Sequence, residues 1–344
     1  GGGGGGGDFS SCRGAFLRAF GAIYICAFVS YWLQYPGTLG EGGLLPAALH
    51  WERLKASQAA TADGPIVLPL PLGLLGGGHG GVLGLLGGGH GGVTLVDGGS
   101  GTAAALRSFA RLPCLLWFAE ILLPGLGVDT ILEGLSLLGV GCGTLALLGV
   151  HHAAVFAAAY LAYLTLLLTG QTFLGFQWDI FLLETGAACI LYARWWGFGP
   201  ARRPQPAVAW VLRAQWVKFM VMSGVVKVTA NCPTWRELTA LEYHFASTCL
   251  PTSEAWLLHS LPPLLLRAGV AIMFLVELAA PWLLLAPVRT IRQVGVAVQV
   301  PLQLAICATG NYNWFNLHTL ALLLPAWDAD ADHTAAAATA ATAA

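Results

Sequence analysis

The stretch "GQTFLGFQWDIFLLETG" at 170–186 places two carboxylates in one of the most apolar regions of the chain. Asp179 and Glu184 are five residues apart, so about 140° separates them around a helix of 3.6 residues per turn. They cannot serve one site on one helical face, and we assign them different roles. Asp179 begins an apolar segment, where the helix dipole stabilises a carboxylate. Together with Gln177 and Trp178, we expect it to mark the membrane interface.

Three ionisable side chains fall near the middle of apolar segments, namely Glu184, Lys218 and Glu277. An unpaired charge at that depth costs at least about 2.5 kcal/mol. We therefore expect an intramembrane charge cluster in which Lys218 pairs with Glu184 and Glu277 competes for the same lysine. One of the two carboxyl groups would then be protonated or hydrogen-bonded. Arg213 and Lys227 lie near the ends of their segment and can reach the interface. Structural pairing is favoured, and a proton or substrate pathway is the alternative.

The composition indicates the class of protein that must position these charges. The chain has 344 residues, of which 56% are hydrophobic and 10% charged, whereas soluble domains carry about 25% charged residues. The mean hydropathy is +0.70, and the apolar residues come in runs long enough to cross a bilayer. We predict an all-α, polytopic helical membrane protein. The net charge of -1 supplies no basic field, which argues against a nucleic-acid partner.

Eight apolar segments are expected to span the membrane. They are 19–35, 131–150, 153–169, 179–193, 208–228, 268–286, 293–309 and 314–327. The apolar segment 112–123 is too short to cross and is expected to lie at the interface. With the N-terminus in the cytosol, the alternation of spans places the arginine-bearing loops 194–207 and 287–292 in the cytosol as well, as the positive-inside rule requires. No small-residue cleavage site follows the first segment, which favours an uncleaved span over a signal peptide.

Composition also divides the chain into regions. We expect a cytosolic tail (1–18), a first span with the start of a loop (19–60), a glycine-rich insert (61–105), a multi-span domain (106–328) and an Ala/Thr-rich disordered tail (329–344). The sequence "LGLLGGGHGGV" occurs twice in the insert, at 72–82 and 83–93. We expect no packed core there, because glycine has no side chain to bury and loses much entropy on folding. The first residue is a glycine and not a methionine, so a longer natural N-terminus is expected.

The stretch at 170–186 closely resembles the "GQ-x-F-x-x-FQWD-x-LLLE-x-G" block of the lipase maturation factor family. Further blocks are similar to that family in order and spacing, at 41–47, 126–139, 223–252, 276–289 and 309–320. The resemblance covers roughly residues 10–328 apart from the glycine insert. It implies an endoplasmic reticulum membrane protein that helps secreted lipases fold and assemble into active dimers, and not a catalyst. Family members continue into a second, largely lumenal half.

The loop 229–267 would then face the oxidising lumen, and it contains Cys232 and Cys249. A disulfide between them would close a loop of about 18 residues, worth roughly 3 kcal/mol, and we predict it. The chain has eight cysteines but no C-x-x-C pair, and no G-x-S-x-G, H-E-x-x-H or P-loop pattern appears. No catalytic, cofactor or metal site is therefore expected.

Two functions of other classes remain as alternatives. The region 268–328 shows a weaker similarity to the membrane part of vitamin K-dependent carboxylases, which implies a membrane-embedded enzyme with a buried lysine as base. The other alternative is a transporter that uses the charges at mid-depth.

Overall fold

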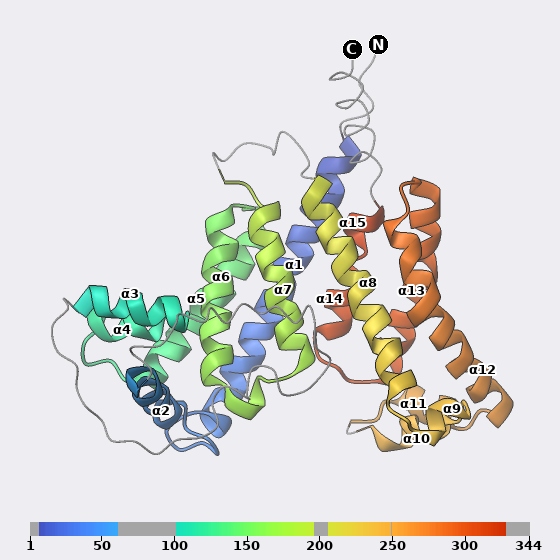
Figure 1. The fold of residues 1–344 in the computed structure, drawn as a ribbon, viewed down its shortest axis with the longest axis horizontal. Coiled ribbons are helices and arrows are strands. Elements are labelled where there is room, and N and C mark those ends of the chain that lie inside the picture. The colour runs from blue at the N-terminus through green and yellow to red at the C-terminus, as the bar shows by residue number, and fades with distance from the viewer. Residues whose placement is uncertain (1–6, 61–100, 196–205, 249, 328–344) are drawn as a thin grey trace, which may run out of the picture. The chain divides into compact units, whose positions relative to one another are not determined.

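The structure is a computed structural model that describes residues 7–60, 101–195, 206–248 and 250–327 (Figure 1). Within these ranges every regular element is a helix. The chain divides into two compact units. Unit 1 comprises Gly1–Phe20 and Trp196–Ala344, and unit 2 comprises Gly21–Trp195. Helix α1 (Gly7–Thr38) contributes its first part to unit 1 and the rest to unit 2.

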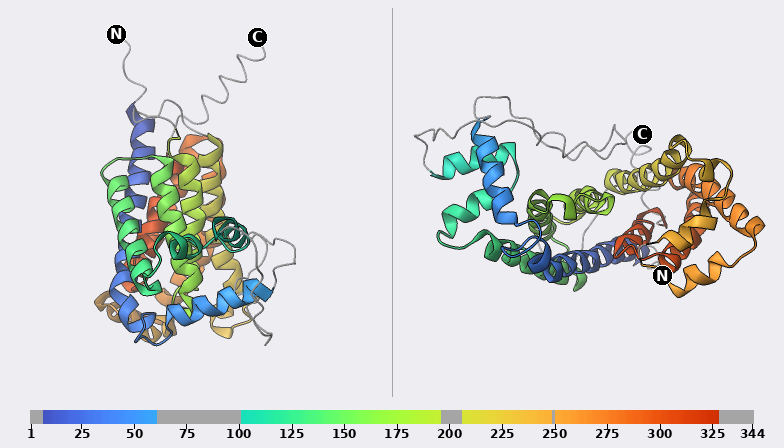
Figure 2. Two further views of the ribbon diagram at one scale, coloured as in Figure 1. Left: turned by 90° about the vertical axis from the view of Figure 1, so that its left-hand side faces the viewer. Right: turned by 90° about the horizontal axis from the view of Figure 1, so that it is seen from below.

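Unit 2 is built on antiparallel helices that follow one another in sequence. Its long helices after α1 are α5 (Val128–Leu147), α6 (Ala153–Thr169) and α7 (Gln177–Tyr192), and α6 packs against both of the others. Three shorter helices precede them, namely α2 (Ala47–Ala60), α3 (Gly101–Arg111) and α4 (Leu116–Leu122). In both Figure 1 and the right-hand view of Figure 2, these three helices lie to one side of α6 and α7.

Unit 1 joins three long helical segments through a set of short helices. The long segments are α8 (Pro206–Thr229), the run from α12 (Pro263–Phe274) through η2 (Leu275–Ala279) and η3 (Ala280–Leu285), and α13 (Arg289–Thr309). The short helices are α9 (Pro233–Arg236), α10 (Ala240–Ser247), α11 (Ser253–His259), α14 (Phe315–Ala321) and α15 (Leu324–Trp327). η2 and η3 pack against α8, and η3 also packs against α13.

Glycines let the helices approach each other closely in both units. A Cβ atom added to Gly21 on α1 would lie 2.7 Å from the carbonyl oxygen of Gly143 on α5. In unit 1, a Cβ atom added to Gly224 on α8 would lie 2.6 Å from the Leu278 side chain on η2. Helices in a bilayer associate through such small-residue contacts, because lipid chains leave little hydrophobic drive for helix association. These contacts fit the membrane class.

Four helical segments of the described chain are long and apolar enough to cross a membrane. They are Cys12–Thr38, Val128–Leu147, Pro263–Leu285 and Arg289–Thr309. The shorter apolar helix α6 covers 153–169, as expected from the sequence. The expectation of a helical, multi-pass membrane protein is confirmed, whereas the count of eight spans stays a prediction.

Two expected boundaries differ in the structure. The last expected span, 314–327, is broken into α14 and α15, which have 7 and 4 residues. At about 1.5 Å per residue, neither helix can cross a bilayer. Residues 101–105, assigned to the glycine-rich insert, form the start of α3, where Ala105 is buried. The rest of the insert and the Ala/Thr-rich tail lie outside the described residues.

Candidate functional site

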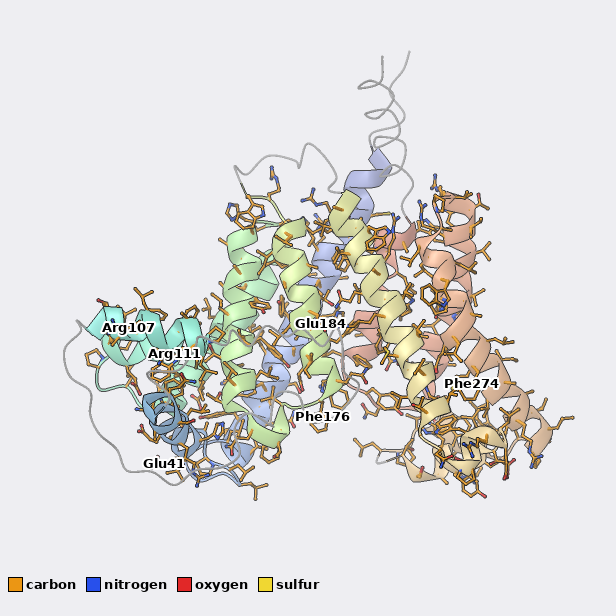
Figure 3. All side chains as sticks on the ribbon, viewed as in Figure 1. Glu41, Arg107, Arg111, Phe176, Glu184 and Phe274 are labelled. Carbon is orange, nitrogen blue, oxygen red and sulfur yellow. The ribbon has the colours of Figure 1, made fainter. Side chains whose placement is uncertain are left out.

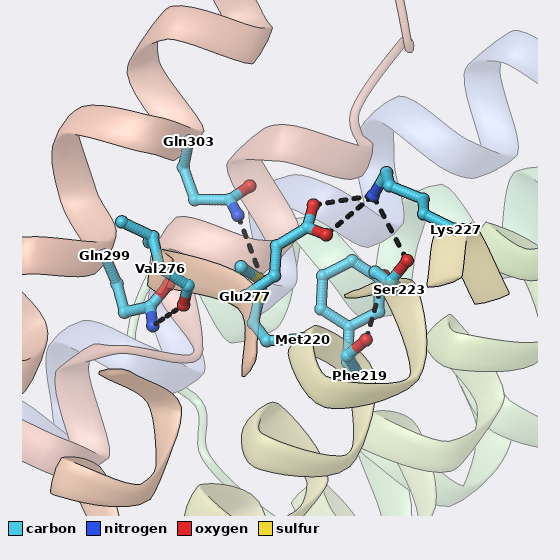
Figure 4. A network of polar contacts seen from close by, with 8 residues as sticks. All are labelled: Phe219, Met220, Ser223, Lys227, Val276, Glu277, Gln299 and Gln303. Carbon is cyan, nitrogen blue, oxygen red and sulfur yellow. Dashed lines mark hydrogen bonds and ion pairs between the residues drawn. The ribbon is translucent and has the colours of Figure 1, made fainter. Parts of the chain in front are cut away.

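The candidate site lies in unit 1 and begins at an irregular turn of a membrane span. Residues Leu275–Ala279 form a π-helical turn between α12 and the 3-10 segment η3. Pro281 follows within one turn and has no N–H to donate. In a π-turn, its nitrogen would be the partner of the carbonyl five residues earlier, which is that of Val276. The side-chain amide of Gln299 on α13 donates to this oxygen instead, at 3.0 Å (Figure 4).

The same π-turn carries Glu277, whose side chain is 5% exposed. Lys227, in the last turn of α8, donates to both carboxylate oxygens at 2.7 Å (Figure 4). The ammonium group also donates to the carbonyl of Ser223 at 3.2 Å. It lies 5.6 Å from the ring centroid of Trp235 on α9, within the range of a cation–π interaction. The pair therefore joins α8, η2 and α9.

A second polar group on α13 extends the network toward α14. The side-chain oxygen of Gln303 accepts from Thr319 at 2.8 Å and from the Asn316 amide at 3.5 Å. Its amide nitrogen lies 3.4 Å from the sulfur of Met220 on α8. Gln299 and Gln303 are four residues apart, so they share one face of α13, and both are buried. This face connects η2, α8 and α14.

The predicted charge cluster can now be compared with these contacts. Glu277 is paired with Lys227, which we had placed near the end of its span as a residue able to reach the interface. Lys218 lies half-buried on α8 and lines a cavity of about 270 Å³ together with Trp282 and Met222. Glu184 lies half-buried partway along α7 in unit 2 (Figure 3). Pairing of Lys218 with Glu184 stays a prediction.

Asp179 occupies the first turn of α7, and its carboxylate is directed to the start of the helix. It accepts the backbone N–H of Phe176 at 3.3 Å, which satisfies one of the amides that a helix start leaves unpaired. It also accepts the hydroxyl of Tyr163 on α6 at 2.6 Å, and it is buried. Gln177 is exposed, and Trp178 stacks on Phe176 with centroids 4.6 Å apart. These contacts fit a role for Asp179 in starting α7. The location of Gln177, Trp178 and Asp179 at the membrane interface stays a prediction.

The predicted disulfide cannot be compared in full, because Cys249 lies outside the described residues. Cys232 precedes α9, and its sulfur lies 3.1 Å from the Thr234 hydroxyl. Hydrogen bonds from the Thr234 side chain and backbone lower the pKa of this thiol. The bridge between Cys232 and Cys249 stays a prediction.

Sequence reasoning missed a polar junction in unit 2. Glu120 on α4 accepts from the indole nitrogen of Trp51 and from the ammonium of Lys55, both at 2.8 Å, and both donors lie on α2. Lys55 also pairs with Glu52 at 2.7 Å. Partial burial lowers the pKa of Lys55, but the hydrogen bonds to the two glutamates outweigh it, so that the pKa is raised. The signal in the sequence was the helix-like "LHWERLKA", which lies in a segment expected to be a loop.

The network in unit 1 suits a structural role. Most of its contacts join different helices, and the charges of Lys227 and Glu277 neutralise each other. Within the described part of the chain, the buried side-chain oxygen of Gln299 accepts no hydrogen bond. Within the described residues, no group of three or more His, Cys, Asp or Glu side chains is placed to hold a metal ion. The arrangement can fix the packing of α8, η2, α13 and α14 at an irregular turn. The missed signal was the pair of glutamines at helical spacing in an otherwise apolar span.

Comparisons with known proteins match most of the sequence to one family. A profile described as the lipase maturation factor transmembrane domain matches residues 11–70 and 95–334. Lipase maturation factor 2 of Xenopus laevis is 35% identical over 324 residues, which are 92% of this chain and 39% of that protein. The human lipase maturation factor 2 is 36% identical over 90% of this chain and 39% of its own length.

Lipase maturation factor 1 of Bos taurus is 26% identical over 94% of this chain and 50% of its own length. The chain thus spans half or less of these relatives. No solved structure matches it. The resemblance noted in the sequence is confirmed by the profile and by the relatives. The chain belongs to the lipase maturation factor family.

Proposed function

We propose that this protein is an endoplasmic reticulum membrane factor that assists the folding of secreted lipases and their assembly into active dimers. The observation that carries the proposal is the match of the family's transmembrane domain to residues 11–70 and 95–334, together with relatives named lipase maturation factors. The helical membrane fold supports it. In this role the protein binds its lipase clients without catalysing a reaction.

The polar network of unit 1 supports a structural scaffold over a transport path. In a transporter, charges at mid-depth are expected to line a route for the substrate or proton. Here the carboxylate of Glu277 is held on both oxygens by Lys227, and the lysine is also bonded to a backbone carbonyl. Such a pair fixes neighbouring helices. We therefore assign the membrane part the task of positioning the segments that face the lumen.

The test of this function is complementation in cultured cells that lack lipase maturation factors. A dimeric secreted lipase is expressed with the chain or with an empty vector, and lipase activity is divided by the mass of secreted lipase. The proposal predicts that the chain raises this specific activity. An unchanged specific activity at equal expression would contradict it, and an increase in secreted mass alone would indicate a general effect on secretion.

We further propose that the N-terminus lies in the cytosol and the segment 229–267 in the lumen. The chain contains no N-x-S/T sequon, so engineered glycosylation sites can report its orientation. Ala246→Asn creates one with Ser247 and Thr248, and Val288→Asn creates one with Thr290; both positions are exposed. Glycosylation of the first variant and not of the second supports this topology, and the reverse result would overturn it.

A further inference from the structure

Helix α11 (Ser253–His259) in unit 1 carries large apolar side chains on two opposite faces. Ala255 and Leu258, three residues apart, share the face that packs into a small core with Phe245 and Leu266. At about 100° per residue, Trp256 and Leu257 fall on the opposite half of the helix. These two residues are 73% and 63% exposed. A helix that is apolar on both sides is normally covered on both sides.

The flanking contacts place α11 at the level where two membrane spans end. Its N-cap residue Thr252 donates its hydroxyl to the carbonyl of Ala308, at 2.8 Å, in the last turn of α13. Only Ser260 to Pro262 separate its end from Pro263, where the candidate span Pro263–Leu285 begins. Because an extended chain spans at most about 3.6 Å per residue, this short link keeps α11 close to the start of the span. Figure 1 shows α11 at the same level as the start of α12 and the end of α13.

The exposed face of α11 also continues into a surface that a bilayer must cover. Leu264 and Leu265, in the first turn of α12, are 77% and 54% exposed, and they belong to the candidate span. The neighbouring Leu266 packs into the same core as Ala255. One rigid core therefore carries the exposed side chains of both helices. Tryptophan is enriched at the interface between lipid and water, which suits Trp256.

We propose that α11 is an interfacial membrane anchor, with Trp256 and Leu257 inserted among the lipids of the leaflet in which α12 begins and α13 ends. The polar residues Glu254 and His259 fall on the two sides of the helix, between the inserted face and the protein core. Ser253 lies on the inserted face in the first turn, where its hydroxyl donates to the carboxylate of Glu254 at 2.8 Å. α11 would thereby hold the segment from α9 to α11 against the membrane surface. The occupant of the exposed face is lipid and not a protein partner.

The test uses the full chain in lipid nanodiscs with a fluorescent non-natural amino acid at position 257. The matched control carries the same residue at position 254, on the polar edge of the same helix. Fluorescence is compared in nanodiscs of phosphatidylcholine with and without bromine on the acyl chains, and with iodide added in water. Gel filtration confirms that both variants are folded.

The proposal predicts that brominated lipid quenches position 257 severalfold more than position 254, and that iodide shows the opposite preference. If iodide quenches both positions equally and brominated lipid quenches neither, the face lies in water and the proposal is wrong. That result would instead assign the exposed face of α11 to a protein partner, because no lipid would cover it in the purified chain.

Discussion

Replacing Lys227 by Met should destabilise the protein far more than replacing its partner Glu277 by Gln. The carboxylate is nearly fully buried, with 5% of its side chain exposed, whereas 21% of the lysine side chain is exposed. In the Lys227→Met variant the carboxylate has lost its counter-ion and cannot reach water. In the Glu277→Gln variant the lysine remains charged but stands at the end of its helix, where a long side chain can extend toward the interface.

The loss in free energy of unfolding caused by Lys227→Met has an upper limit. The stranded carboxyl group can take up a proton, and protonating a group with an ordinary pKa of about 4.3 at pH 7 costs about 3.7 kcal/mol. Breaking a buried ion pair by removing one partner typically costs about 3–5 kcal/mol. We therefore expect a loss of about 3 kcal/mol for Lys227→Met and about 1 kcal/mol for Glu277→Gln. The double variant should resemble Glu277→Gln, so that the two effects are far from additive.

The assay is unfolding of the purified protein by SDS in mixed micelles, followed by tryptophan fluorescence, for the parent and the three variants. Arg267→Met is the control, because this exposed side chain on α12 pairs with Glu242 at 3.2 Å and exposed pairs contribute about 0–1 kcal/mol. Equal losses for the two single variants that add up in the double variant would show that Lys227 and Glu277 do not act as a pair.

Gln299→Leu should lower the free energy of unfolding by about 1–3 kcal/mol in the same SDS assay. The reason is that the carbonyl of Val276 then has neither the Gln299 amide nor a proline N–H as a donor. An effect no larger than that of an exposed substitution on α13 would contradict this. Tyr163→Phe should destabilise the protein more than Asp179→Asn. Asparagine keeps an acceptor for the tyrosine hydroxyl, whereas phenylalanine leaves the buried carboxylate of Asp179 without that donor. The reverse order of stability in SDS would argue against this contact. Cys232 and Cys249 should resist alkylation until a reductant is added, as peptide mass spectrometry can show, and full alkylation without reductant would exclude the disulfide.

Helix positions in this protein are largely predictable from hydrophobicity. The apolar run 153–169 corresponds to α6, and the run 208–228 falls within α8 (Pro206–Thr229). The position of each of these helices depends on the hydrophobicity of consecutive residues, which the sequence shows directly. The run 314–327 was predicted less well, because apolar composition alone does not show that buried polar side chains, such as that of Asn316, direct short helices into the protein.

The partners of buried polar groups could not be predicted in the same way. Glu277 was recognised as a charge in need of a partner, but Lys227 is 50 residues away and its selection depends on how α8 packs against η2. The π-turn at Leu275–Ala279 inserts one extra residue and so shifts the side-chain register of the span once. It depends on packing and on Pro281 together. Hydrophobic periodicity carries no information on either point.

The proposed role in assembling lipase dimers is tested most directly by the fraction of secreted lipase that is present as dimers. Medium from factor-deficient cells expressing a dimeric lipase, with or without the chain, is separated by sedimentation, and lipase mass and activity are measured across the gradient. We expect the chain to move lipase mass from inactive, monomeric or aggregated fractions into the active dimer fraction. An unchanged dimer fraction, with the chain expressed and correctly inserted in the endoplasmic reticulum membrane, would contradict it.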